Sequence, residues 1–146
     1  MHHWVFHKAF NADEWFGFCY LITSPCGRMY IGKKQFRHTT RKKVKGRKNR
    51  KHITKQSDWM TYTGSSKELC AAIASQGIEN FRFDIISLHE TKGSLTYAEV
   101  VWQLTFDVLR ATLPDGRRAF YNKAITTNIR FIPPKPTDRE REHRIS

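Results

Sequence analysis

The chain has 146 residues, the usual size of a single domain, which leaves room for a hydrophobic core but not for several elaborate binding sites. It carries 26 Lys and Arg against 13 Asp and Glu, and the whole excess of +13 falls between residues 16 and 57, where thirteen basic residues stand without an acidic one. This concentration of charge favours a polyanionic partner. The sequence has no signal-peptide pattern and no apolar stretch of about eighteen residues that could span a membrane, so we expect a protein that is neither exported nor membrane-bound.

The three cysteines, Cys19, Cys26 and Cys70, are odd in number and lack the paired spacing of a zinc site. We therefore expect reduced thiols, a cytoplasmic location and no zinc.

The first elements in chain order are an aromatic segment and a β-hairpin. Residues 1–15 bring Trp4, Phe6 and Phe10, which we expect to cover one side of a sheet. Residues 18–22 are rich in β-branched and aromatic side chains, residues 24–27 contain the Pro and Gly of a tight turn, and residues 28–32 return as a second strand.

A strongly basic segment follows at residues 35–57. It is expected to be a solvated, mobile loop with a short helix over 36–43, because Val44 and Ile53 are its only aliphatic residues and bury too little apolar surface to offset the lost chain entropy. The other interpretation, which is the favoured one if the preceding hairpin belongs to a nuclease, is a clamp on the backbone of DNA that orders on contact. Its candidate DNA-binding residues are Lys34, Lys42, Lys43, Lys45, Arg47, Lys48, Arg50 and Lys51.

The second half of the chain alternates helical and strand patterns. Residues 59–64 are β-rich, and the run from Ser65 to Glu68 has the spacing of a capping box before a helix over 67–76, which Gly77 is suited to end. A third strand is expected over 81–88, and a second helix over 95–111. Residues 133–146 contain three prolines and mixed charge, so we expect a flexible tail.

These elements predict an α+β fold in which helices flank a small three-stranded antiparallel sheet. The domain would span residues 1–132, with the basic loop 35–57 inserted and the tail 133–146 outside it.

Two tyrosines carry a resemblance to a known family. Tyr20 follows Cys19 in the first strand, and Tyr30-Ile31-Gly32-Lys33 stands ten residues later, so both phenols could lie on one side of the hairpin. This pair resembles the motif of the GIY-YIG nuclease superfamily, which includes homing endonucleases and the incision subunit of bacterial nucleotide-excision repair. Phe18-Cys19 departs from the family's usual Gly and aliphatic residue, but later pieces occur in the right order over residues 16 to 125.

The resemblance implies a metal-dependent endonuclease acting on double-stranded DNA, with Mg²⁺ or Mn²⁺ held by Glu99. Tyr20 or Tyr30 would be the general base, favoured as a phenolate by Lys33, and Asn122 would match the family's asparagine. The family's arginine, about ten residues after the second tyrosine, falls here on Thr40. Its place would be taken by Arg41 or by Arg37, which are one helical turn apart if this stretch is helical.

Each of these residues also has a structural interpretation. Glu99 could complete a capping box with Thr96 at a helix start, Asn122 could bond the backbone of a turn, and the tyrosines could be core residues. The alternative function is a basic nucleic-acid-binding protein on the same fold without catalysis. A membrane-active cationic protein is disfavoured, since no basic amphipathic helix is present.

Further expectations follow from the resemblance alone. The enzyme would be of phage or homing type, would work in a bacterial or phage-infected cytoplasm, and would need no small-molecule cofactor. A homodimer on DNA is one route to cutting both strands, because one active site cuts one strand.

Overall fold

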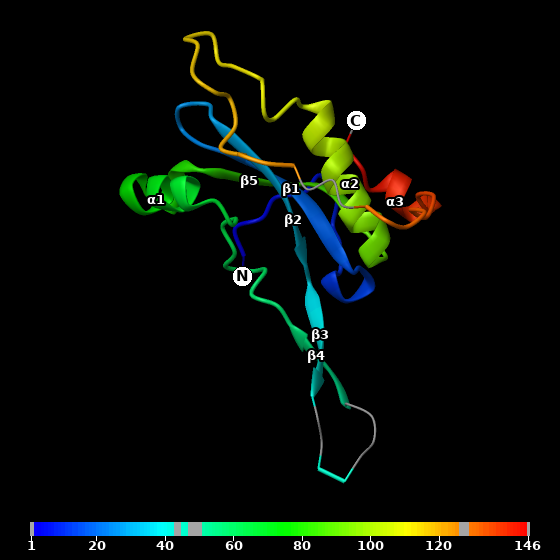
Figure 1. The fold of residues 1–146 in the computed structure, drawn as a ribbon. Helices are drawn as coiled ribbons and strands as arrows, with labels where there is room; N and C mark the ends of the chain where they lie inside the picture. The colour runs from blue at the N-terminus through cyan, green and yellow to red at the C-terminus, as the bar shows by residue number, and fades with distance from the viewer. Residues whose placement is uncertain (1, 43–44, 47–50, 126–128, 146) are drawn as a thin grey trace.

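The structure, a computed structural model, describes residues 2–42, 45–46, 51–125 and 129–145, without the side chains of residues 40–42 and 51–53. Figure 1 shows a three-stranded sheet with helices around it and a second hairpin that projects away from this body. The elements in chain order are η1 (Ala12–Glu14), β1 (Gly17–Thr23), β2 (Met29–Gln35), β3 (Arg37–Lys42), β4 (Lys51–Gln56), α1 (Lys67–Gln76), η2 (Ile78–Asn80), β5 (Arg82–His89), α2 (Lys92–Thr105) and α3 (Asp138–Glu142).

The main sheet confirms the predicted α+β fold. Its strand order is β2-β1-β5, and both strand pairs are antiparallel. In the β1–β2 register Tyr20 faces Gly32 and Ile22 faces Tyr30, so the two tyrosines lie diagonally on one face, as expected. Their ring centroids are 6.2 Å apart.

Alternation along β1 divides the hydrophobic core between the two faces of the sheet. Phe18, Tyr20 and Ile22 are buried on one face, together with the N-terminal aromatic residues and α1. Cys19 is buried on the other face against α2 and Trp102. The expectation that Trp4, Phe6 and Phe10 cover one side of the sheet is confirmed.

Helix α1 has the predicted bounds but a different start. Ser66 is the N-cap, and its hydroxyl accepts a hydrogen bond from the Leu69 amide at 3.2 Å. The predicted capping box from Ser65 to Glu68 is wrong, because Glu68 instead accepts a hydrogen bond from Arg28 at 2.9 Å. Gly77 ends the helix with φ of 89°, as its sequence position predicted.

Helix α2 starts and ends earlier than predicted. Its N-cap is Thr91, whose hydroxyl accepts from the Ser94 amide at 3.1 Å. The helix stops at Thr105, and Asp107 then takes a positive φ of 53°. Glu99 therefore lies in the middle of α2, so its interpretation as a capping residue with Thr96 is wrong.

The basic segment is a β-hairpin where a loop and a short helix were expected. β3 pairs antiparallel with β4, and Arg37 faces Gln56. The hairpin is anchored where it leaves the body, because Phe36 is 1% exposed and its carbonyl accepts from the Ser57 amide at 2.8 Å. Burial at the base thus stabilises a ribbon whose own strands carry few apolar residues. Residues 59–64, expected to be β-rich, form no strand.

The C-terminal segment is partly helical, so the expectation of a flexible tail over 133–146 is wrong for α3. Glu140 on α3 is 5% exposed and accepts hydrogen bonds from the Ser94 hydroxyl and the Glu90 amide. Burial by itself raises the pKa of Glu140, but these bonds and those from His89 and Thr137 lower it to about 2. Among the described residues, no helix is long and apolar enough to cross a bilayer.

Candidate active site

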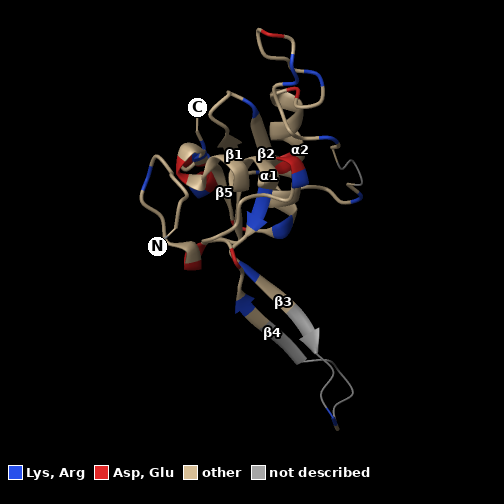
Figure 2. Ribbon diagram, turned by 90° about the vertical axis from the view of Figure 1, so that its left-hand side faces the viewer, with Lys and Arg blue, Asp and Glu red and all other residues tan. Residues whose placement is uncertain are grey.

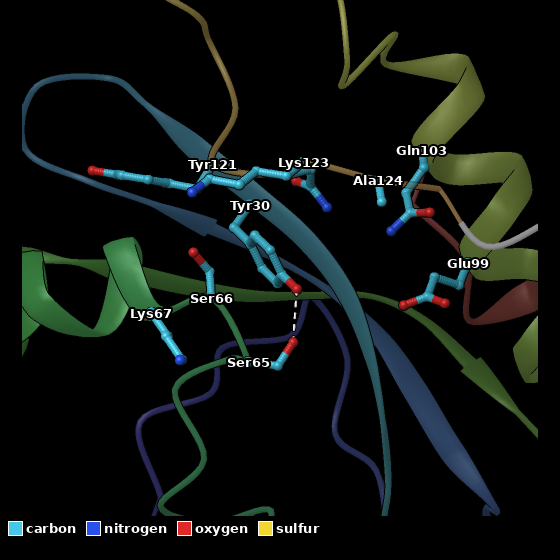
Figure 3. Close-up of a pocket in the computed structure, with 10 residues that line it drawn as sticks. Tyr30, Ser65, Ser66, Lys67, Glu99, Gln103, Tyr121, Lys123 and Ala124 are labelled. Atoms are coloured by element: carbon cyan, nitrogen blue, oxygen red, sulfur yellow. Dashed lines mark hydrogen bonds between the residues drawn. The ribbon is translucent and has the colours of Figure 1, made fainter.

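A pocket of about 440 Å³ opens beside β2, at the outer edge of the main sheet. Four parts of the chain meet there, namely β2, the start of α1, the middle of α2 and the segment after Phe120, as Figure 3 shows. The residues that line the pocket are Tyr30, Ser65, Ser66, Lys67, Glu99, Gln103, Tyr121, Asn122, Lys123 and Ala124.

The two motif tyrosines have different environments. Tyr30 is half-buried and lines the pocket, where its hydroxyl lies 2.8 Å from that of Ser65. Tyr20 is 1% exposed and does not line the pocket, because its ring lies over Gly32. A side chain at position 32 would place Cβ 2.6 Å from Cζ of Tyr20. The glycine of the motif therefore makes room for the first tyrosine, and the second tyrosine faces solvent.

Burial raises the pKa of both tyrosines. For Tyr20 burial is the main cause and Tyr62 adds to it; for Tyr30 burial is partly offset by the hydrogen bond with Ser65. The expectation that Lys33 favours a phenolate is wrong, because Lys33 lies on the opposite face of β2 from Tyr30. Its amino group instead donates to Thr96 at 3.3 Å and lies 4.0 Å from the Glu99 carboxylate.

Glu99 reaches the pocket from α2 and shares it with Tyr30 (Figure 3). Its side chain is 18% exposed. Burial raises the pKa of Glu99, and the nearby Lys33 partly opposes this shift. A partly desolvated carboxylate at the wall of an open pocket is an electrostatically favourable place for a second cation.

The donor set at Glu99 fits a hydrated divalent ion. In the part of the chain that the structure describes, no three His, Cys, Asp or Glu side chains cluster as a metal site would require. Mg²⁺ often binds proteins through one or two carboxylates and keeps several waters, so a single glutamate beside a pocket of this volume is sufficient. Mn²⁺ accepts the same oxygen ligands.

Asn122 lines the pocket, but its amide group is occupied by β2. Its Oδ1 accepts from the Ile31 amide at 3.1 Å, and its Nδ2 donates to the Ile31 carbonyl at 2.8 Å. Gln103, one turn after Glu99 on α2, donates to the same carbonyl at 3.1 Å. These bonds fix α2 and the segment around Asn122 to the edge of β2 and so hold the pocket walls together.

Arg37 does not line the pocket. It lies at the base of the β3–β4 hairpin, where its guanidinium donates to the Asp13 carbonyl at 3.0 Å and forms an ion pair with the Asp13 carboxylate at 3.5 Å. Arg41 is also on β3, so the two arginines are not one helical turn apart, and that expectation is wrong. The side chain of Arg41 lies outside the described part of the structure.

The candidate DNA-binding residues belong mainly to the hairpin. Lys34 precedes it on β2, and its amino group pairs with Asp58 at 2.6 Å and lies over the ring of Tyr62. Lys45 is exposed in the turn, and Lys42 and Lys51 face each other at the ends of the strands. Lys43, Arg47, Lys48 and Arg50 lie outside the described residues.

Several polar side chains in the pocket were not found from the sequence, although three of them stand at the predicted start of a helix. Ser65, Ser66 and Lys67 come from the turn into α1, and Lys123 follows Asn122. The run Ser65-Ser66-Lys67-Glu68, predicted to be a capping box, was a local signal for polar groups at a helix N-terminus. Only the folded chain brings that terminus to Tyr30.

A comparison with known families agrees with this geometry. The family model described as "Putative endonuclease segE, GIY-YIG domain" matches residues 4–125, a range that includes every residue of the pocket. No curated protein and no solved structure matches the chain. Since the family match covers most of the sequence and the paired tyrosines lie on adjacent strands as the motif requires, the chain belongs to the GIY-YIG nuclease superfamily.

Proposed function

We propose that this protein is a metal-dependent endonuclease that hydrolyses phosphodiester bonds in double-stranded DNA, with Tyr30 as the general base and Glu99 as the ligand of Mg²⁺ or Mn²⁺. The observation that carries the proposal is that Tyr30 and Glu99, 69 positions apart in the sequence, line one open pocket. Tyr30 is preferred to Tyr20 as the base because Tyr20 is almost fully buried.

The reaction requires a water to attack the phosphorus while the bond to the leaving sugar oxygen breaks. Tyr30 takes a proton from the attacking water, since its hydroxyl is the one tyrosine oxygen among the motif residues that faces the pocket. When bound at Glu99, the divalent ion supplies positive charge that lowers the energy of the charged transition state. Lys67, at the start of α1, and Lys123, whose amino group lies 4.0 Å from the Glu68 carboxylate, would supply positive charge to the phosphate oxygens.

The β3–β4 hairpin would hold the duplex. β3 carries Lys and Arg, β4 carries Lys, and neither strand has an acidic residue. Figure 2 shows the hairpin extending away from the body. A two-stranded ribbon fits the width of the DNA major groove, and cations along it can reach the phosphates on either side. This mode of binding gives affinity mainly through the DNA backbone, so we expect a modest sequence preference.

Cleavage of supercoiled plasmid in the presence of Mg²⁺ tests this function. Tyr30→Phe and Glu99→Gln should each lower the cleavage rate by about 1,000-fold or more, because each removes a group needed in the transition state. Both variants should bind a DNA duplex in EDTA within about threefold of the wild-type protein. Tyr97→Phe, an exposed tyrosine on α2 outside the pocket, is the matched control and should cut normally.

Two results would contradict the proposal. Cleavage by Glu99→Gln at the wild-type rate would remove the proposed site. DNA binding without nicks after long incubation of the wild-type protein with Mg²⁺ or Mn²⁺ would instead favour a nucleic-acid-binding protein on a nuclease fold. The ratio of nicked to linear plasmid would show whether one strand is cut at a time or both strands are cut together, as a homodimer on DNA would do.

A further inference from the structure

The hydroxyl of Ser65 connects the Tyr30 phenol to solvent. The two oxygens are 2.8 Å apart, and Ser65 is exposed on the turn into α1 (Figure 3). The next residue, Ser66, uses its own hydroxyl to cap the helix through the Leu69 amide. Ser65 is therefore not needed as a cap, and its hydroxyl is available to Tyr30.

The proposed base needs such a partner. Burial raises the pKa of Tyr30, so a phenolate is scarce at neutral pH. Lys33, which could have stabilised the phenolate, lies on the other face of β2 beside Glu99. A neutral phenol can accept a proton only if it releases its own at the same time, and its hydroxyl is already paired with that of Ser65.

We infer that Ser65 is a positioning residue that relays the proton of Tyr30 to solvent while Tyr30 accepts a proton from the attacking water. The inference rests on the proposed nuclease function. As the water oxygen bonds to phosphorus, the bond from phosphorus to the leaving sugar oxygen breaks. The proton of the water moves to Oη of Tyr30, the former hydroxyl proton of Tyr30 moves to Oγ of Ser65, and the proton of Ser65 moves to bulk water. Both side chains end neutral, one proton passes to solvent, and the leaving oxygen takes one proton from solvent to become a hydroxyl.

Two substitutions at position 65 separate this relay from a structural role. Ser65→Ala should lower kcat by roughly 10- to 100-fold with less than about threefold change in KM, since it removes only the path of the proton. Its rate should also depend more steeply on pH, rising toward the pKa of Tyr30, because the phenol must then ionise first. Ser65→Thr retains a hydroxyl and should recover most of the activity.

A titration of Tyr30 gives a readout independent of cleavage. With ¹³C-labelled tyrosine, NMR should show a higher pKa for Tyr30 in Ser65→Ala, because the bond with Ser65 lowers that pKa in the wild-type protein. Ser75→Ala, at an exposed serine further along α1, is the matched control and should change neither the titration nor the rate.

The outcomes distinguish the relay from the nuclease function. An active nuclease in which Ser65→Ala has the wild-type rate and pH profile would overturn the relay alone, and Tyr30→Phe and Glu99→Gln would still report on the site. A wild-type protein unable to cut DNA would overturn the proposed function and the relay with it.

Discussion

Two antiparallel hairpins follow each other in this chain and differ in almost every physical respect. In β1–β2, Phe18, Cys19 and Ile31 are fully buried, and the pair lies inside a sheet with core on both faces. In β3–β4, Thr39 and Thr54 face each other in the open, with their hydroxyls 3.1 Å apart. We call the first the body hairpin and the second the arm.

The difference separates stability from binding. An isolated two-stranded ribbon is marginal in water, so the arm depends on its base, where β3 continues from β2 after the buried Phe36. Among the side chains of the arm that the structure describes, Thr39, Thr54 and Lys55 are exposed and can meet a ligand. Substitutions in the body should therefore change stability or cleavage, whereas substitutions in the arm should change binding.

The largest expected effect on DNA binding comes from removing the outer arm. Replacing residues 42–51 by Asn-Gly joins Arg41 to His52, which face each other in the β3–β4 register, through a two-residue turn. If six of the deleted cations contact phosphates, the slope of log affinity against log salt should weaken by about 5, and Kd at physiological salt should rise by at least about 100-fold. Fluorescence anisotropy with a DNA duplex in EDTA measures both, while Tm should stay within about 3 °C.

A matched control removes cations from outside the arm and the pocket. Lys92, Arg130 and Lys135 are exposed, and their combined replacement by Gln should weaken the salt slope far less than the deletion does. An unchanged slope in the deletion variant would break the assignment of binding to the arm.

The second-largest expected effect comes from replacing Lys67, a pocket lysine at the start of α1 and outside the arm. Lys67→Ala should lower kcat by roughly 30- to 100-fold, because a charge held against the phosphate is lost, while the salt slope should fall by only about 1. Lys67→Arg should recover most of the rate. Lys92→Ala, which also changes the first residue of a helix, is the matched control. Wild-type cleavage by Lys67→Ala would show that the phosphate is held elsewhere.

The fold was largely predictable because the main strands and α1 are encoded locally. β-Branched and aromatic residues identified β1, alternation at its start identified β5, and Gly77 marked the end of α1. The end of α2 was not predictable, since Leu109 continues the apolar period after the chain has turned at Asp107. The arm was missed because its pairing depends on the buried Phe36, outside the strands themselves.

The residues of the candidate site were predictable only where they match a known family motif. Tyr30 and Glu99 followed from the resemblance, and the structure brings them to one pocket. Ser65 and Lys67 reach that pocket through the packing of α1, which no local pattern reports. Lys33 was predicted to act on a tyrosine. Its position on β2 instead puts it on the face opposite to Tyr30, where its amino group lies near Glu99.

The third prediction tests how tightly the body hairpin is packed. Gly32→Ala should destabilise the protein by about 2 kcal/mol, because the new Cβ would lie 2.6 Å from Cζ of the buried Tyr20 ring. Thr54→Ala, in the exposed arm, should change stability by less than about 0.5 kcal/mol. Urea unfolding at neutral pH measures both. Equal effects of the two substitutions would remove the contrast in packing between body and arm.

The smallest effect tests whether α3 belongs to the body. Glu140→Gln should lower stability by about 1 to 2 kcal/mol at pH 7, because it weakens the buried hydrogen bonds to Ser94 and Glu90. The folded pKa of about 2 is below the ordinary value, so this contribution is complete above about pH 4.3 and is lost as the pH falls toward 2. Urea unfolding at pH 7, 5 and 3 should show that the difference in stability between the wild-type protein and Glu140→Gln narrows at the lowest pH.

Glu142→Gln, at an exposed position of the same helix, is the control and should have the stability of the wild-type protein. DNA affinity should be unchanged in both variants, because the arm is remote from α3 (Figure 1). A stability difference between the wild-type protein and Glu140→Gln that persists unchanged at pH 3 would mean that the charge of Glu140 does not hold α3 to the body.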